Sequence, residues 1–113
     1  MTTHIDNATL TSGQSLTGAL NMKNKILMAL EIPSTWTTAN ITFQVSIDGT
    51  NYNDLYDSDG NEVTFTTVAG KHQYSKDPLA FIPFNWIKLR SGTTAVAVNQ
   101  SGDRTITAVF DEE

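Results

Sequence analysis

The strongest constraint on the fold is a strict alternation of apolar and polar residues over residues 41–48. Ile41, Phe43, Val45 and Ile47 alternate with Thr42, Gln44, Ser46 and Asp48. Successive side chains of a strand point to opposite faces, so the alternation predicts a strand with one apolar face and one polar face. The Asp48-Gly49 pair that follows suits a tight turn, because both residues tolerate positive φ angles. A half-apolar strand needs neighbouring strands and a covering layer, so we expect a layered β protein.

Comparable short stretches recur along the chain and are separated by turn residues. We expect strands near residues 8–10, 15–22, 26–32, 52–56, 62–67, 71–74, 86–90 and 104–110, in addition to 41–47. In the 86–90 stretch, Ile87 and Leu89 would share one face, whereas Lys88 and Arg90 would be solvated charges, as would Arg104. Turn signals at intervals of about ten residues are typical of all-β folds. The pattern predicts an antiparallel β-sandwich, jelly-roll-like, with about seven to nine short strands.

Residues 15–32 fit two patterns. Several leucines at near-helical spacing would allow an amphipathic helix. A glycine and two asparagines interrupt that helix, and residues 26–32 also fit a period of two. We therefore favour two strands joined by a turn at Lys23-Asn24-Lys25, with the second strand ended by Pro33.

The length of 113 residues suits one small domain. We expect an extended polar N-terminal arm at residues 1–7, a single β-sandwich domain at residues 8–110 and an acidic tail at residues 111–113. The first residues lack the basic and apolar segments of a secretory signal, so we expect none.

Composition and charge disfavour several kinds of partner. The formal net charge is −5 and the pI is about 4.8. An acidic surface repels phosphate groups and anionic lipids, so we expect neither nucleic acid nor membrane as a partner. The chain has no cysteine, which leaves neither disulfides nor thiolate metal sites to stabilise the fold.

One acidic cluster invites a metal-binding interpretation. Asp57, Asp59 and Glu62, with Asp54 before them, would offer the oxygen ligands that Ca²⁺ prefers. Their spacing does not fit the EF-hand loop. Asp, Asn and Gly are also each favoured in tight turns for backbone reasons, with no metal ion required. We therefore favour a hairpin turn and expect no cofactor and no catalytic residues, since no motif for a nucleophile, metal or phosphate is present.

Aromatic residues offer a second candidate site. Trp36 and Trp86, with Tyr52 and Tyr56, would stack on sugar rings if their faces were exposed. The alternative is that Trp36 caps one end of the core, while Trp86 fills the core or a subunit interface. The first interpretation would make the chain a carbohydrate-binding or host-adhesion module.

Several segments occur in a distinctive order. These are residues 33–46, Asp48-Gly49, and residues 54–57, 60–63, 87–93, 98–100 and 104–107. This order resembles a family of small virion-associated proteins of tailed bacteriophages and prophages, and the similarity covers about residues 15–110. The resemblance implies a phage structural β-sandwich without catalytic residues, and specifically a capsid decoration, or cement, protein.

The resemblance also implies partners and a location. We expect the chain to be made in the cytoplasm of the bacterial host and to end in the virion. Its partners would be further copies of itself, as in a trimer, and the major capsid protein or another virion protein. Edge strands and the N-terminal residues Thr2, Thr3, His4 and Ile5 are the expected contacts, because unpaired backbone groups invite a neighbouring chain. A module associated with the tail, baseplate or fibre is the remaining alternative.

Overall fold

The structure, a computed structural model, describes residues 2–112 and is built from eight strands. The strands are β1 (Thr2–Leu10), β2 (Leu20–Asn21), β3 (Lys25–Glu31), β4 (Ile41–Ser46), β5 (Asn53–Asp54), β6 (His72–Tyr74), β7 (Trp86–Ser91) and β8 (Arg104–Glu112). A single turn of 3₁₀ helix, η1 (Pro78–Phe81), lies between β6 and β7. No helix within this range is long and apolar enough to cross a membrane.

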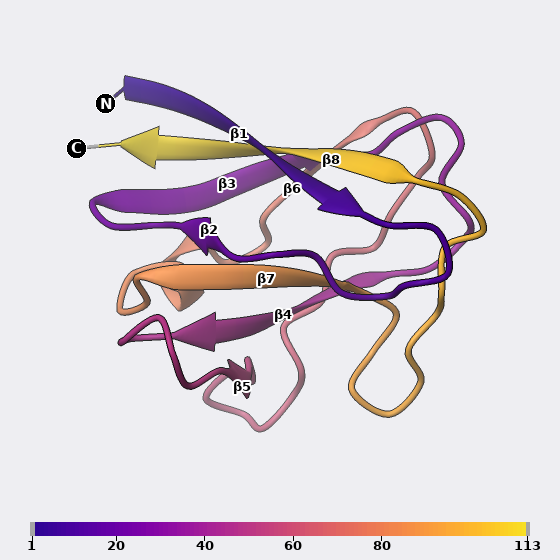
Figure 1. The fold of residues 1–113 in the computed structure, drawn as a ribbon. Helices are drawn as coiled ribbons and strands as arrows, with labels where there is room; N and C mark the ends of the chain where they lie inside the picture. The colour runs from indigo at the N-terminus through magenta and orange to yellow at the C-terminus, as the bar shows by residue number, and fades with distance from the viewer. Residues whose placement is uncertain (1, 113) are drawn as a thin grey trace.

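The strands form two four-stranded antiparallel sheets that pack face to face. Sheet A has the order β1-β8-β3-β6 and sheet B the order β2-β7-β4-β5. Figure 1 shows sheet A as the upper layer and sheet B as the lower one. The first strand pairs with the eighth, the second with the seventh, the third with the sixth and the fourth with the fifth. This is the order of an eight-stranded jelly roll, and it confirms the predicted sandwich.

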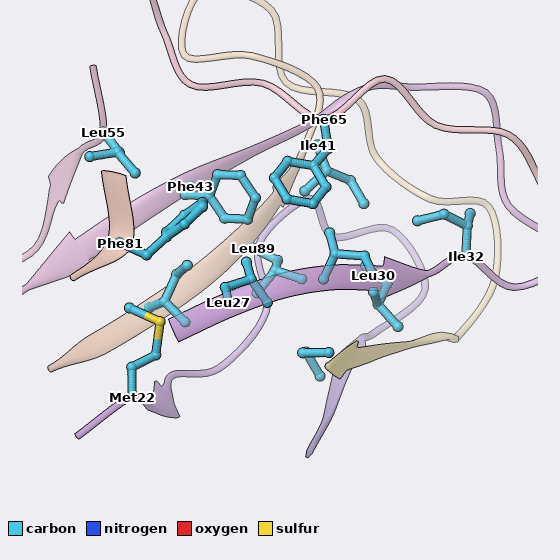
Figure 2. Packing of buried hydrophobic residues seen from close by; sticks show 14 of the residues in the cluster. Met22, Leu27, Leu30, Ile32, Ile41, Phe43, Leu55, Phe65, Phe81 and Leu89 are labelled. Carbon is cyan, nitrogen blue, oxygen red and sulfur yellow. The ribbon is translucent and has the colours of Figure 1, made fainter. Parts of the chain in front are cut away.

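The predicted apolar face of β4 forms the centre of the core. Ile41, Phe43 and Val45 are buried, and the ring of Phe43 packs edge-on against Phe65 and Phe81 with 5.2 Å between centroids in both pairs. Edge-to-face contacts of this kind are favoured by the ring quadrupoles. Figure 2 shows these rings meeting the leucines of β3 and β7 between the sheets. The aromatic cluster therefore joins strand, loop and 3₁₀ helix in one core.

The prediction that Ile47 continues this face is wrong. β4 ends at Ser46, and 69% of Ile47 is exposed. The Ser46 hydroxyl accepts hydrogen bonds from the backbone N–H groups of Asp48 and Gly49, and Gly49 has a φ of +78°. Because these bonds begin the predicted turn one residue early, Ile47 leaves the plane of the sheet.

Residues 15–32 contain strands, as favoured, and no helix. Asn24 occupies the predicted turn with a φ of +61°, and β3 begins directly after it. The pairing of β3 with β8 shifts between Leu27 and Ala29, so a bulge at Met28 lets Leu27 and Leu30 both enter the core. That bulge explains the mixture of helical and strand spacing in the sequence.

Two predicted strands are shorter than expected and a third is absent. β5 covers Asn53–Asp54 rather than 52–56. β2 covers two residues rather than 15–22, because the chain around Leu16 and Thr17 contacts β7 only through single bridging bonds. Residues 62–67 form no strand, and Phe65 instead exchanges two backbone hydrogen bonds with Ile41 at 2.8 and 2.9 Å.

The first and last strands both belong to sheet A, so residues 2–7 and 111–112 are paired strand residues rather than the predicted free arm and tail. All nine residues of β1 pair with β8, from Thr2 opposite Glu112 to Leu10 opposite Arg104. The first and last strands lie side by side in Figure 1. Residues 2–7 are extended, as predicted, but β8 supplies the hydrogen-bonding neighbour that an isolated arm would lack. Met1 and Glu113 lie outside the described residues.

Phe43→Ala is expected to lower the free energy of unfolding by about 3–5 kcal/mol, because the change leaves a cavity among packed rings. Urea denaturation followed by fluorescence would measure the loss. Ile47→Ala is the matched control, since its exposed side chain should contribute about 0.5 kcal/mol or less. A loss below about 1 kcal/mol for Phe43→Ala would contradict this account of the core.

Candidate interaction surfaces

An apolar stripe crosses the solvent-facing side of sheet A. Ile5 of β1 pairs with Val109 of β8, Val109 with Ala29 of β3, and Ala29 with Tyr74 of β6. Directly paired residues share a face, so these four side chains form one row from edge to edge. The two ends are strongly exposed, at 60% for Ile5 and 84% for Tyr74. This row is called the sheet A stripe below.

Polar side chains border the stripe. On one side, Thr107 pairs with both Asn7 and Glu31 across the sheet, and its hydroxyl bonds the Asn7 side chain at 3.0 Å. Further along this row, the Glu31 carboxylate lies 3.1 Å from the Nε2 atom of His72. Thr3 and Asp111 pair on the other side of the stripe. An apolar centre with a polar rim is the usual anatomy of a protein interface.

The N-terminal residues predicted as contacts lie at the free edge of this sheet. Thr2, Thr3 and Ile5 are exposed, and Ile5 is part of the stripe. His4 points to the opposite face, where its ring lies 3.4 Å from Asp6 and 3.8 Å from Glu112. The structure thus joins the predicted segment to a larger surface. Sequence reasoning missed the rest of that surface, because its residues are adjacent only through strand register.

A second apolar surface lies at one end of sheet B. Two adjoining hollows of about 490 and 340 Å³ share Leu55, Tyr56 and Phe84. Ile47 borders the first hollow and Leu79 the second, and both are mostly exposed. We call this region the Tyr56 groove. Exposed apolar hollows of this kind are typical of places where a partner's side chain inserts.

The prediction that Arg90 is a solvated charge is wrong. The residue is only 8% exposed, and its guanidinium donates hydrogen bonds to Asp54, to Glu62 at 3.3 Å and to Thr94 at 2.9 Å. The Thr94 backbone N–H and hydroxyl donate in turn to Glu62. These contacts attach β7 to β5 and to two loops. A buried arginine of this kind requires several acceptors at once, and the fold supplies them.

Two carboxyl groups are held in their charged form by donors. The Arg90 guanidinium lowers the pKa of Asp54 through its hydrogen bond and charge, against an opposing effect of partial burial. The backbone N–H groups of Asn51 and Thr50 lower the pKa of Asp48. Each shift reflects a structural contact, one in the Arg90 network and the other in the turn after β4.

The calcium candidates have separate structural roles. Asp57 accepts hydrogen bonds from the backbone N–H groups of Asp59 and Asn61, which closes the turn, while Glu62 belongs to the Arg90 network. Within residues 2–112, no group of three or more histidine and carboxylate side chains is placed to hold a metal ion. The geometry therefore agrees with the hairpin-turn interpretation.

The aromatic candidates are not gathered into one face. Trp36 is 6% exposed and its indole N–H donates to the Ala39 carbonyl at 3.0 Å, so it caps the core and is closed to sugars. The Lys88 ammonium lies 4.3 Å from the ring centre of Tyr52, and that of Lys23 lies 5.9 Å from Trp86. Tyr56 borders its groove. Trp86 and Tyr52 are half-buried and Tyr56 is exposed, so these three rings stay candidates for stacking on a sugar.

Comparison with known proteins supports the fold. No protein-family model and no curated protein matches the chain. A similar fold occurs in the crystal structure of the SPBc2 prophage-derived protein YomS, with a TM-score of 0.58 and 12% sequence identity. The match covers 97% of this chain and 95% of the other. The shared fold therefore includes both sheets.

Arg90→Met is expected to lower the free energy of unfolding by about 3 kcal/mol, because Asp54 and Glu62 would lose their shared counter-charge in a water-poor site. Lys88→Met, on the same face of the same strand, removes a more exposed charge and should cost less than about 1 kcal/mol. Parallel urea melts would measure both. Equal losses would contradict the assigned role of the network.

The lowered pKa of Asp54 predicts a dependence on pH. A carboxyl group whose pKa is lower when folded stabilises the fold above its unfolded pKa of about 3.9. This stabilisation is lost as the pH falls through the lower folded value. Wild type should therefore exceed Asp54→Asn in stability by a constant amount between pH 5 and 7, and the difference should shrink below about pH 4. Urea melts across this range would check it, and a constant difference down to pH 2 would contradict it.

Proposed function

We propose that this chain is a non-enzymatic structural protein of a bacteriophage particle, and that it decorates the outer surface of the capsid. The observation that carries the proposal is the fold shared, over nearly the full length of both chains, with a prophage-derived protein. Jelly rolls are frequent in viral capsid domains, which adds support by analogy at the level of the fold. The order of sequence segments described above points to the same class.

The surfaces of the molecule support a binding role. The sheet A stripe and the Tyr56 groove both expose apolar side chains, which a protein that binds through surface area requires. The buried Arg90 guanidinium is bonded to Asp54 and Glu62, so its role is to hold strands and loops together rather than to contact a partner. A decoration protein needs only moderate affinity at each site, because many copies on a symmetric shell act together.

Each surface suits a different partner. The Tyr56 groove is hollow and would accept an inserted side chain of the major capsid protein or another virion protein. The sheet A face is flatter and ends at the free edge of β1, where a neighbouring strand is the natural partner. We therefore assign the groove to the virion and the edge to other copies of the chain.

Particles of the phage that encodes this chain should contain it in many copies. Mass spectrometry of purified particles would detect the chain, and separated heads and tails would show its location. Recovery with heads is the expected result. Recovery with tails alone would move the protein to the tail, baseplate or fibre, and absence from particles would refute a virion role.

Leu79→Asp should weaken rebinding of the purified protein to particles that lack it by about tenfold or more, because the change puts a charge beside the Tyr56 groove. Val68→Asp carries the same change of charge at an exposed position outside the groove and should bind like wild type. Co-sedimentation with the particles would measure both. Equal binding by the two variants would remove the groove from the interface.

A further inference from the structure

Sheet A has one long free edge. β1 stands at the end of the strand order, and its nine residues pair with β8 on one side only. The other three edge strands in the described part of the chain, β2, β5 and β6, have two or three residues each. Short edge strands are a common protection against unwanted pairing, as are lysine, proline and bulges. β1 has none of these protections, since its sequence lacks both residue types and its register is unbroken.

The sequence of β1 is complementary to itself. When a second copy runs antiparallel with Ile5 opposite Ile5, positions equally far from Ile5 on either side become partners. His4 then faces the partner's Asp6, and Asp6 faces the partner's His4, so an imidazole meets a carboxylate twice. Thr3 faces the partner's Asn7 in the same register. No two like charges are opposite one another in the described residues of this arrangement.

The same register extends the sheet A stripe. Ile5 ends the stripe at the open edge, where 60% of the residue is exposed. A second copy placed in this register adds its own Ile5 beside the first, and its Val109, Ala29 and Tyr74 continue the row. The apolar row then runs unbroken across both molecules. The two Ile5 side chains, the most exposed apolar groups of β1, cover each other.

We infer that two copies of this chain associate through β1, in the antiparallel register that places Ile5 opposite Ile5 across a two-fold axis. The two A sheets become one continuous eight-stranded sheet. The interface is isologous, because both copies use the same strand and the same face. This association concerns the purified chain alone, so its failure can be distinguished from failure of the proposed virion role.

Single cysteines test the register directly, because the chain has no cysteine of its own. Paired residues of antiparallel strands have Cβ atoms about 4.5–5.5 Å apart, which is within reach of a disulfide with slight adjustment. Ile5→Cys should therefore form a covalent dimer under mild oxidation. Thr3→Cys should not do so alone, since two such positions lie about 13 Å apart along the strands. A mixture of Thr3→Cys with Asn7→Cys should give the mixed dimer.

Ile5→Asp tests the energetics, because it places like charges opposite one another on the two-fold axis. Sedimentation equilibrium should give twice the 12.4 kDa chain mass for wild type, and the variant should dissociate with a Kd about a hundredfold higher. Val96→Asp introduces the same charge at a similarly exposed position outside β1 and should remain dimeric. Urea melts of both variants would show that the fold is intact.

Three outcomes would overturn the inference. Wild-type protein that is monomeric up to about 1 mM would exclude the self-pairing at any relevant strength. A dimer unaffected by Ile5→Asp would place the interface elsewhere, and cross-linking of Thr3→Cys with itself would show a different register. Monomeric wild type whose particle binding is lost in Ile5→Asp would assign the β1 edge to a virion protein instead.

Discussion

The fold depends on the pairing of the first strand with the last. β8 lies between β1 and β3, so sheet A cannot be completed until the C-terminal residues are in place. The same nesting recurs inward through the successive pairs, down to the adjacent strands β4 and β5. Most stabilising contacts therefore join residues far apart in sequence, which makes closing the chain costly in entropy and folding slow compared with helical domains.

The alternation of residue types was sufficient to predict much of this architecture. Ile41, Phe43 and Val45 lie in the core as their spacing indicates, because a period of two is a direct property of strand geometry. Ile47 differs because the Ser46 hydroxyl begins the turn early, and side-chain hydrogen bonds of this kind do not alter a hydropathy pattern. The bulge at Met28 had a similar effect in β3, where it mixed two periodicities.

The candidate surfaces were less accessible to sequence reasoning, for a physical reason. Arg90 is buried because Asp54 and Glu62 reach it from segments 36 and 28 residues away. Tyr74 joins Ile5 in the stripe only through the registers of three strand pairs. Local composition predicts which residues are polar, but the partner that decides burial or exposure is set by topology. The N-terminal residues were expected to form a free arm, because a strand pairing between the two ends of a sequence leaves no local signal; β8 supplies that pairing in the structure.

The pairing of Thr2 with Glu112 also makes the molecule almost circular. Paired strand residues have Cα atoms only about 4.5–5.5 Å apart, so a few added residues could join the two ends. Such a link would leave sheet A unchanged, since no backbone hydrogen bond between β1 and β8 needs to change. New ends could then be opened in an exposed turn such as that around Val96, which follows β7 of sheet B. A sequence fused to such an end would lie beside sheet B instead of sheet A.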